Sequence, residues 1–148
     1  MELTPSQVGA RAERAVAFAL EAAGKRVYLP LFLPDSRVDL VFEDEDGLHR
    51  VQCKTSQLKK GAIFFRTCSN TGNVPKAYSG EADVFGVYSP ELDQVFLVPV
   101  AEAPVRGCHL RLDPARNGQV KGVRQASDYL LTPGTERLTP AQPPLFAA

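Results

Sequence analysis

Asp39, Gln52 and Lys54 have the side-chain chemistry for metal-assisted hydrolysis, provided that the fold brings them together. A hard cation such as Mg²⁺ takes oxygen ligands, commonly one or two carboxylates with water and a phosphate oxygen. The attacking water must lose a proton, and a nearby cation must stabilise the negative charge that develops at phosphorus. Asp39 can bind the metal, and the Gln52 amide oxygen and the backbone carbonyl of Cys53 can be further ligands. Lys54 can orient the water, so these residues indicate phosphodiester hydrolysis.

A β-hairpin is the element that must position these side chains. Residues 37–43 and 48–55 alternate between polar and apolar types, which is typical of half-buried strands. The acidic, glycine-closed segment 44–47 between them is typical of a tight turn.

The register of this hairpin decides which side chains share a face. A loop of two or four residues places Asp39 opposite Gln52, or opposite Lys54 if Asp46 and Gly47 form the centre of the turn. Side chains alternate along a strand and paired residues share a face, so in both registers the three polar side chains project together. The other face then carries Val38, Leu40, Phe42, Val51 and Cys53. A three-residue loop would break this parity.

A helix is predicted at the start of the chain. Thr4 is a suitable N-cap, Pro5 suits the first helical position and Gln7 completes a capping box. Apolar residues recur at spacings of three and four up to about Ala23, which predicts a buried stripe. Glu13 lies at the margin of that stripe.

The remaining pattern predicts one domain over residues 1–131. Further strands are expected at residues 26–29, 62–67, 83–88, 94–98 and 108–112, with a short closing helix at 123–130. No long amphipathic helix is evident between residues 55 and 82. Residues 132–148 are rich in Pro, Thr and Ala, and we expect a flexible tail there.

Composition narrows the class of protein. No apolar run is long enough for a membrane span, and the first residues do not resemble a signal peptide, so we expect a cytoplasmic protein. The three cysteines, Cys53, Cys68 and Cys108, are widely spaced without a C-x-x-C pair, which argues against a disulfide framework or a structural zinc site. They are expected to be small core residues.

The distribution of charge favours a polyanionic partner, although the 17 basic and 17 acidic residues cancel. Residues 47–80 contain no Asp or Glu and six Lys or Arg residues. Within this stretch, Lys59, Lys60 and Arg66 are the predicted phosphate contacts, although a basic loop is often only a solvated surface.

Several segments, in order and spacing, resemble one known group of proteins. They are Gly9-Ala-Arg-Ala-Glu13, Ser36-Arg-Val-Asp39-Leu-Val, Val51-Gln-Cys-Lys-Thr-Ser56, Tyr78 with Ala82-Asp83-Val-Phe-Gly-Val-Tyr-Ser-Pro-Glu91, and Arg111-Leu-Asp-Pro-Ala-Arg-Asn-Gly-Gln119 followed by Ala126 and Tyr129. They resemble the PD-(D/E)XK nuclease superfamily, and more closely its group I intron homing-endonuclease-like branch, in which Gln-x-Lys replaces the acidic-x-Lys element. The literal Pro34-Asp35 precedes the alternating strand, so Asp39 is the expected acid.

The resemblance implies an α/β fold with a restriction-endonuclease-like core, in which helices flank a mixed central β-sheet. It also implies a Mg²⁺ site at the hairpin, with Glu13 as a helix-borne acid nearby. The predicted function is Mg²⁺-dependent endonuclease cleavage of double-stranded or structured DNA. The small surface of the chain suggests a homodimer or homotetramer for sequence-specific cleavage. Two alternatives are a non-catalytic DNA-binding or assembly module, because Gln52 is neutral, and a junction-type repair nuclease.

Overall fold

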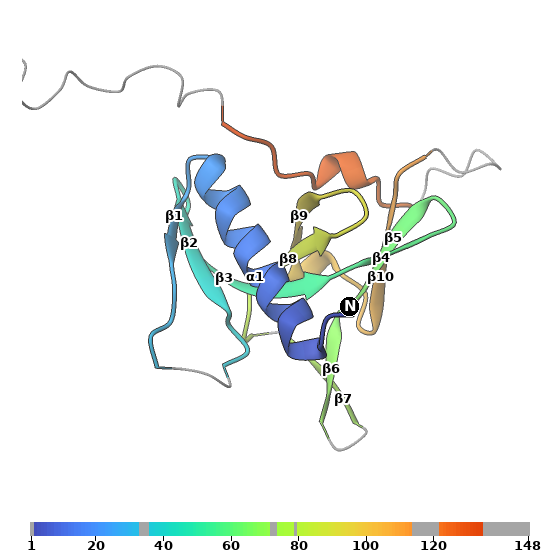
Figure 1. Cartoon of the computed structure of the whole chain (residues 1–148), viewed down its shortest axis with the longest axis horizontal. Helices are drawn as coiled ribbons and strands as arrows, with labels where there is room; N and C mark the ends of the chain where they lie inside the picture. The colour runs from blue at the N-terminus through green and yellow to red at the C-terminus, as the bar shows by residue number, and fades with distance from the viewer. Residues whose placement is uncertain (1, 33–35, 72–73, 79, 114–121, 135–148) are drawn as a thin grey trace, which may run out of the picture.

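A five-stranded mixed sheet is the centre of the computed structural model, which describes residues 2–32, 36–71, 74–78, 80–113 and 122–134. Its strand order is β1-β2-β3-β8-β9, and β3 and β8 are parallel while the other neighbours are antiparallel. The strands are β1 (Arg26–Tyr28), β2 (Leu40–Asp44), β3 (Gly47–Thr55), β8 (Val84–Ser89) and β9 (Gln94–Pro99). Figure 1 shows helix α1 (Pro5–Ala22) lying across this sheet.

Helix α1 begins where the sequence predicts, because the capping box between Thr4 and Gln7 is formed in both directions. Its buried stripe is Ala12, Val16 and Leu20. This stripe packs on apolar residues of the sheet that include Leu40, Phe42, Val51, Cys53 and Val95. The helix therefore covers the apolar face of the β2–β3 hairpin.

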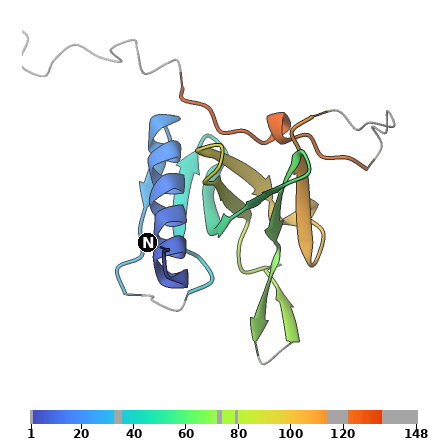
Figure 2. The same cartoon turned by 45° about the vertical axis from the view of Figure 1, so that its right-hand side comes forward.

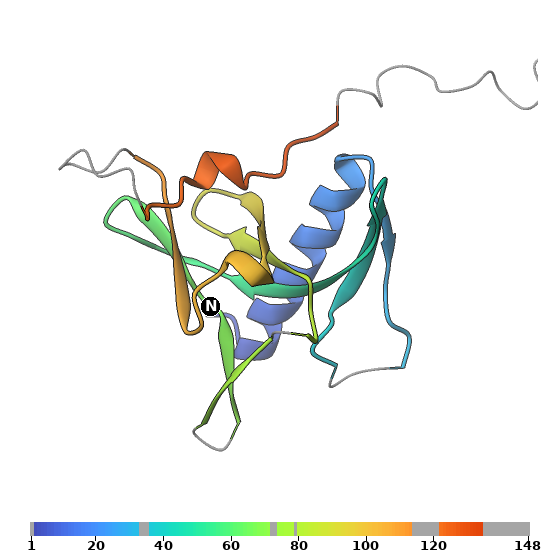
Figure 3. The same ribbon diagram turned by 180° about the vertical axis from the view of Figure 1, so that it is seen from behind.

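A second sheet covers the opposite face of the central sheet. Its order is β10-β5-β4, formed by β4 (Gln57–Lys59), β5 (Ala62–Arg66) and β10 (Gly107–Arg111). Ile63, Phe65 and Leu110 from this sheet pack with Phe85 and Val87 in a separate core. Figure 2 and the rear view in Figure 3 show α1 and β10 on opposite sides of the central sheet.

Three short elements complete the described structure. The hairpin of β6 (Cys68–Thr71) and β7 (Val74–Ala77) projects from the body of the molecule (Figure 2). The 3-10 helices are η1 (Val100–Glu102) and η2 (Ala126–Asp128). No helix in the described part of the chain is long and apolar enough to span a membrane.

The register of the β2–β3 hairpin is confirmed. Asp44 pairs with Gly47 and Leu40 pairs with Val51, so the turn between the strands has two residues and the next pair along the ladder would be Asp39 with Gln52. The strands predicted at 26–29, 62–67, 83–88, 94–98 and 108–112 occur with ends that differ by one residue at most.

The structure differs from the sequence-based expectations at one predicted helix and at three short strands. The predicted helix over residues 123–130 is wrong, since only η2 is helical and Gln125 and Leu130 form isolated bridges to Arg111 and Phe96. The buried Ala126 anchors this segment against the second core, which explains its apolar spacing without a helix. Strands β4, β6 and β7 were not predicted and occupy the region where no long helix was found. Three predicted features lie outside the described residues. They are the Pro34-Asp35 pair, residues 114–119 of the last resembling segment, and residues 135–148 of the predicted tail.

Candidate active site

Asp39 lies immediately before β2 and is fixed to the neighbouring strand by two hydrogen bonds. Its backbone N–H donates to the Val51 carbonyl at 2.8 Å. Its Oδ2 atom accepts from the backbone N–H of Cys53, also at 2.8 Å. The Asp39 carboxylate therefore accepts the hydrogen bond of a β3 backbone N–H group just before β2 begins.

Glu13 reaches Asp39 from helix α1, so the structure brings together two acids that are 26 positions apart in the sequence. The pKa of Glu13 is raised, first by burial and then by the charge of Asp39 and a hydrogen bond between the two carboxyl groups. Burial also raises the pKa of Asp39, although the Cys53 N–H and the positive charge of Lys54 act in the opposite direction. Two adjacent carboxyl groups with raised pKa values form an anionic site that a cation would stabilise.

Gln52 carries a buried polar atom that the protein does not satisfy. Its side-chain Oε1 atom has no hydrogen-bond partner among the described residues. Gln52 pairs with Phe85 across β3 and β8, so it lies on the face of the sheet opposite α1. A buried acceptor without a partner costs about 1–3 kcal/mol, and a bound cation would remove that cost.

The Cys53 carbonyl has a backbone position suited to a further ligand. The N–H and C=O groups of one residue in an extended strand point toward the same edge, and the Cys53 N–H donates to Asp39. Its thiol, in contrast, is buried against the α1 side, and burial raises the pKa of the Cys53 thiol well above its usual range. Only the carbonyl is therefore suited to a role in the site.

Lys54 contributes the positive charge of the site. Its positive charge partly offsets the burial that raises the pKa of Asp39. Its Nζ atom donates a hydrogen bond of 3.1 Å to the hydroxyl of Tyr78. Gln52 and Lys54 both face away from α1, as the alternation predicted, whereas Glu13 approaches Asp39 from the helix side.

These donors fit a hard cation. They comprise two carboxylates, one amide oxygen and one backbone carbonyl, which is an all-oxygen set of the kind that Mg²⁺ binds. Among residues 2–32, 36–71, 74–78, 80–113 and 122–134, no group of three or more His, Cys, Asp or Glu residues could hold a metal. The site would therefore need the Gln52 and Cys53 oxygens to complete its ligand shell.

The predicted phosphate contacts form two separate groups. Lys59 and Lys60 lie at the tip of the β4–β5 hairpin, where Lys60 has a left-handed φ of 48° and Gly61 a φ of 75°. Arg66 is at the other end of β5, roughly 13 Å along the strand at about 3.3 Å per residue. All three side chains are exposed. Arg50 of the same basic stretch is already paired with Asp83 at 3.0 Å.

Two residues near Lys54 were not assigned a role from the sequence. Tyr78 and Arg37 stand in segments that carry the resemblance, but the sequence alone assigned neither of them to the site. Arg37 precedes Asp39 by two positions, so alternation along an extended strand would place both side chains on one face. This spacing was the one sequence signal that could have pointed to Arg37. The structure stacks the Arg37 guanidinium on the Tyr78 ring at 3.7 Å from the ring centroid.

His49 has a structural role, and the three cysteines are core residues as predicted. The His49 Nε2 atom lies 2.7 Å from Asp44, and its ring stacks on Phe42 with a centroid separation of 4.7 Å. The three cysteines are buried and free.

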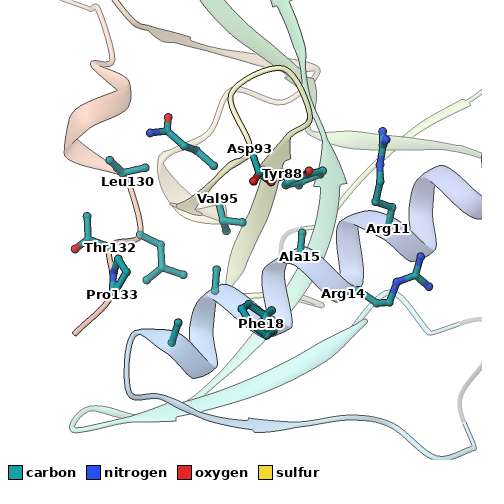
Figure 4. A pocket seen from close by; sticks show the side chains of 14 residues that line it. Arg11, Arg14, Ala15, Phe18, Tyr88, Asp93, Val95, Leu130, Thr132 and Pro133 are labelled. Carbon is teal, nitrogen blue, oxygen red and sulfur yellow. Dashed lines mark hydrogen bonds between the residues drawn. The ribbon is translucent and has the colours of Figure 1, made fainter. Parts of the chain in front are cut away.

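One hollow of the molecule is distinct from this site. It has a volume of about 660 Å³ and lies between α1, the β8–β9 strands and the segment around Leu130 (Figure 4). Its lining includes Arg14, Phe18 and Tyr88, all on the helix side of the central sheet. A smaller hollow of about 430 Å³, lined in part by Arg50, Tyr78 and Asp83, adjoins the face that carries Gln52 and Lys54.

A helix on a mixed sheet, with an acid before one hairpin strand and Gln-x-Lys on the next, defines a restriction-endonuclease-like protein. The sequence matches the PD-(D/E)XK endonuclease family over residues 3–132, and the chain belongs to this family. The chain also resembles the solved structure of a bacterial homing endonuclease, I-Ssp6803I, with 24% identity and a TM-score of 0.63 over 87% of this chain and 88% of that one. This likeness confirms the fold. No curated protein matches the sequence.

Proposed function

We propose that this protein is a Mg²⁺-dependent endonuclease that hydrolyses phosphodiester bonds of DNA. The observation that carries the proposal is the buried Gln52 Oε1 atom, which has no hydrogen-bond partner among the described residues. Gln52 precedes Cys53, whose N–H binds Asp39, and Asp39 in turn contacts Glu13. A structural role for Gln52 would leave the cost of that buried acceptor unexplained. Membership of a nuclease family and the fold of a homing endonuclease support the same proposal.

Each proposed catalytic residue has a separate task. Asp39, the Gln52 amide oxygen and the Cys53 carbonyl would hold the cation, and Glu13 supplies a second carboxylate. When bound, Mg²⁺ would lower the pKa of a water and neutralise phosphate charge. Lys54 places its ammonium group where it can orient the water and stabilise negative charge on the reacting phosphate. Water adds to phosphorus and the bond to one bridging oxygen breaks, leaving one strand end with the phosphate and the other with a hydroxyl group.

Plasmid cleavage tests this proposal directly. Purified protein should cut plasmid DNA with Mg²⁺ and should not cut it with a chelator, and Asp39→Asn should remove the activity. An absence of Mg²⁺-dependent cleavage from a folded parent, together with DNA binding, would support the non-catalytic module instead. Parallel assays on linear duplex and on a four-way junction of the same sequence distinguish a duplex nuclease from a junction-type nuclease.

We also propose that the active form is a homodimer or homotetramer. Four large apolar residues around the end of β1, Tyr28, Leu29, Leu31 and Phe32, have exposed fractions of 48, 69, 83 and 83%. Apolar groups clustered in this way are typical of association surfaces. A monomeric mass by light scattering at roughly 50 µM protein, where assemblies of micromolar affinity form, would contradict this proposal.

A further inference from the structure

The ammonium group of Lys54 contacts both the hydroxyl group and the aromatic ring of one residue, Tyr78. Its Nζ atom lies 3.1 Å from the Tyr78 hydroxyl and 4.5 Å from the centroid of the Tyr78 ring. A lysine has a flexible four-carbon stem and freely rotating donors, so its ammonium group has no fixed position without such a partner. The contact with Tyr78 therefore restricts the charge that the proposed reaction needs.

Tyr78 is itself immobilised by its surroundings. It is only 5% exposed, and its ring makes an edge-to-face contact with Phe85 at a centroid distance of 5.6 Å. The Arg37 guanidinium covers the ring at 3.7 Å and pairs with Glu81 at 3.2 Å. Two cations thus contact one ring, and the Glu81 carboxylate offsets the positive charge of Arg37. A group held on several sides is a rigid support for a catalytic side chain.

We propose that Tyr78 is a positioning residue that holds the Lys54 ammonium group in its working orientation, with Arg37 clamping the Tyr78 ring. This inference rests on the proposed nuclease function, because it assigns Tyr78 a role in the same site. Tyr78 contacts Lys54 and acts through it, so its hydroxyl should affect the rate of the chemical step and not the affinity for DNA. A simple packing role would depend on the ring alone.

The substitution Tyr78→Phe separates these two roles, because it removes the hydroxyl and keeps the ring. Tyr88→Phe is the matched control, since it removes a hydroxyl that bonds Asp93 at 3.0 Å on the helix side of the sheet. Single-turnover cleavage should slow about tenfold in Tyr78→Phe, equivalent to about 1.4 kcal/mol, and stay at the parental rate in Tyr88→Phe. The Kd for DNA, measured with Ca²⁺ in place of Mg²⁺, should be unchanged in both.

A second measurement does not depend on activity. In ¹⁵N-lysine-labelled protein, the ammonium signal of Lys54 is assigned as the one missing from Lys54→Met. A hydrogen-bonded ammonium group exchanges slowly with water, so this signal should be visible in the parent and in Tyr88→Phe and should weaken in Tyr78→Phe.

The combined results separate failure of the inference from failure of the proposed function. If the parent protein does not cleave DNA, the nuclease proposal is refuted. In that case a Lys54 signal that still depends on Tyr78 would show only a structural contact, and the positioning role would be overturned as well. An active parent with Tyr78→Phe at full rate, or with a weakened Kd in place of a slower rate, overturns the inference alone. If Tyr78→Phe weakens the fold, Arg37→Gln tests the clamp, with slower cleavage at unchanged Kd expected and parental cleavage contradicting it.

Discussion

The Oδ2 atom of Asp39 accepts a 2.8 Å hydrogen bond from the backbone N–H of Cys53. This bond joins the proposed metal-binding carboxylate directly to the strand that carries Gln52 and Lys54. It fixes the carboxylate at the start of β2, where the backbone ladder between β2 and β3 ends.

Asp39→Asn should abolish cleavage while the fold remains. The amide keeps an oxygen that can accept from Cys53 but loses the charge that binds the cation, so cleavage should fall by at least 10²–10³, on the order of the loss for other electrostatic catalytic groups. Asp39→Ala also removes the acceptor, so it should cost about 1–3 kcal/mol of unfolding free energy more than Asn. Plasmid cleavage and urea unfolding measure the two effects. Parental cleavage by the folded Asn variant would exclude Asp39 from the site.

The paired carboxyl groups should give a distinct pH dependence of stability. Because folding raises the pKa of both Glu13 and Asp39, the unfolded chain loses these protons at lower pH. Their contribution to stability is therefore greatest below the ordinary carboxyl pKa values and is lost as pH rises through the raised ones. Asp44 and Asp83 have lowered pKa values, so their contribution to stability grows as pH rises. The effect of Glu13 and Asp39 is therefore measured as the difference in unfolding free energy between the parent and the double variant Glu13→Gln/Asp39→Asn.

In that comparison, performed with a chelator, the double variant should gain stability relative to the parent as pH rises from 4 to 7. Adding Mg²⁺ at about 100 times its Kd should stabilise the parent by about 2.7 kcal/mol and leave the double variant unchanged. Equal pH profiles for the two proteins would show that the carboxyl groups do not interact as the structure indicates.

The two substitutions of Gln52 should change the metal requirement in opposite directions. Gln52→Glu replaces a partial charge with a full one, so cleavage should persist at a lower Mg²⁺ concentration. Without metal it puts a charged oxygen where the Gln52 Oε1 atom is buried without a partner among the described residues, so it should lower the thermal midpoint. Gln52→Ala should raise the Mg²⁺ concentration needed. Metal titrations of cleavage rate measure both, and loss of activity in Gln52→Glu would mean that the amide serves the site by hydrogen bonding.

Lys59 and Lys60 should contribute to DNA affinity through phosphate contacts. Lys59→Gln and Lys60→Asn remove one charge each, and Asn is chosen because it tolerates the left-handed φ at position 60. The slope of log affinity against log salt should flatten by about 0.9 for each lost contact. Arg26→Gln is the control, since Arg26 is an exposed cation on the edge strand β1, paired with Glu43. A slope equal to that of the control would assign both lysines to ordinary surface.

Gly86 lets helix α1 approach the central sheet closely. A Cβ at this position would lie 2.6 Å from Cγ1 of Val16 and 3.0 Å from Cγ1 of Val51. Gly86→Ala should therefore destabilise the protein by about 1–3 kcal/mol through overpacking. In a Val16→Ala background the same change should cost less, because the main clashing atoms are gone, and additive costs in denaturant unfolding would contradict this packing.

The local elements of this fold could be predicted from the sequence because short-range physics specifies them. The capping residues Thr4 and Gln7 start the helix, and a two-residue turn sets the hairpin register that places Gln52 and Lys54 on one face. Apolar alternation predicted five further strands for the same reason. The short segments β4, β6 and β7 carry too few alternating residues to be recognised.

Only the tertiary structure decided which distant residues meet. Packing of α1 through Val16 against the sheet brings Glu13 to Asp39, and the connection between β5 and β8 brings Tyr78 over Lys54. The same packing buried Gln52 Oε1 with no partner among the residues that the structure describes, and it left Lys60 and Arg66 at opposite ends of β5. Sequence spacing specifies neighbours along one helix or hairpin, whereas contacts between elements depend on how their buried faces dock.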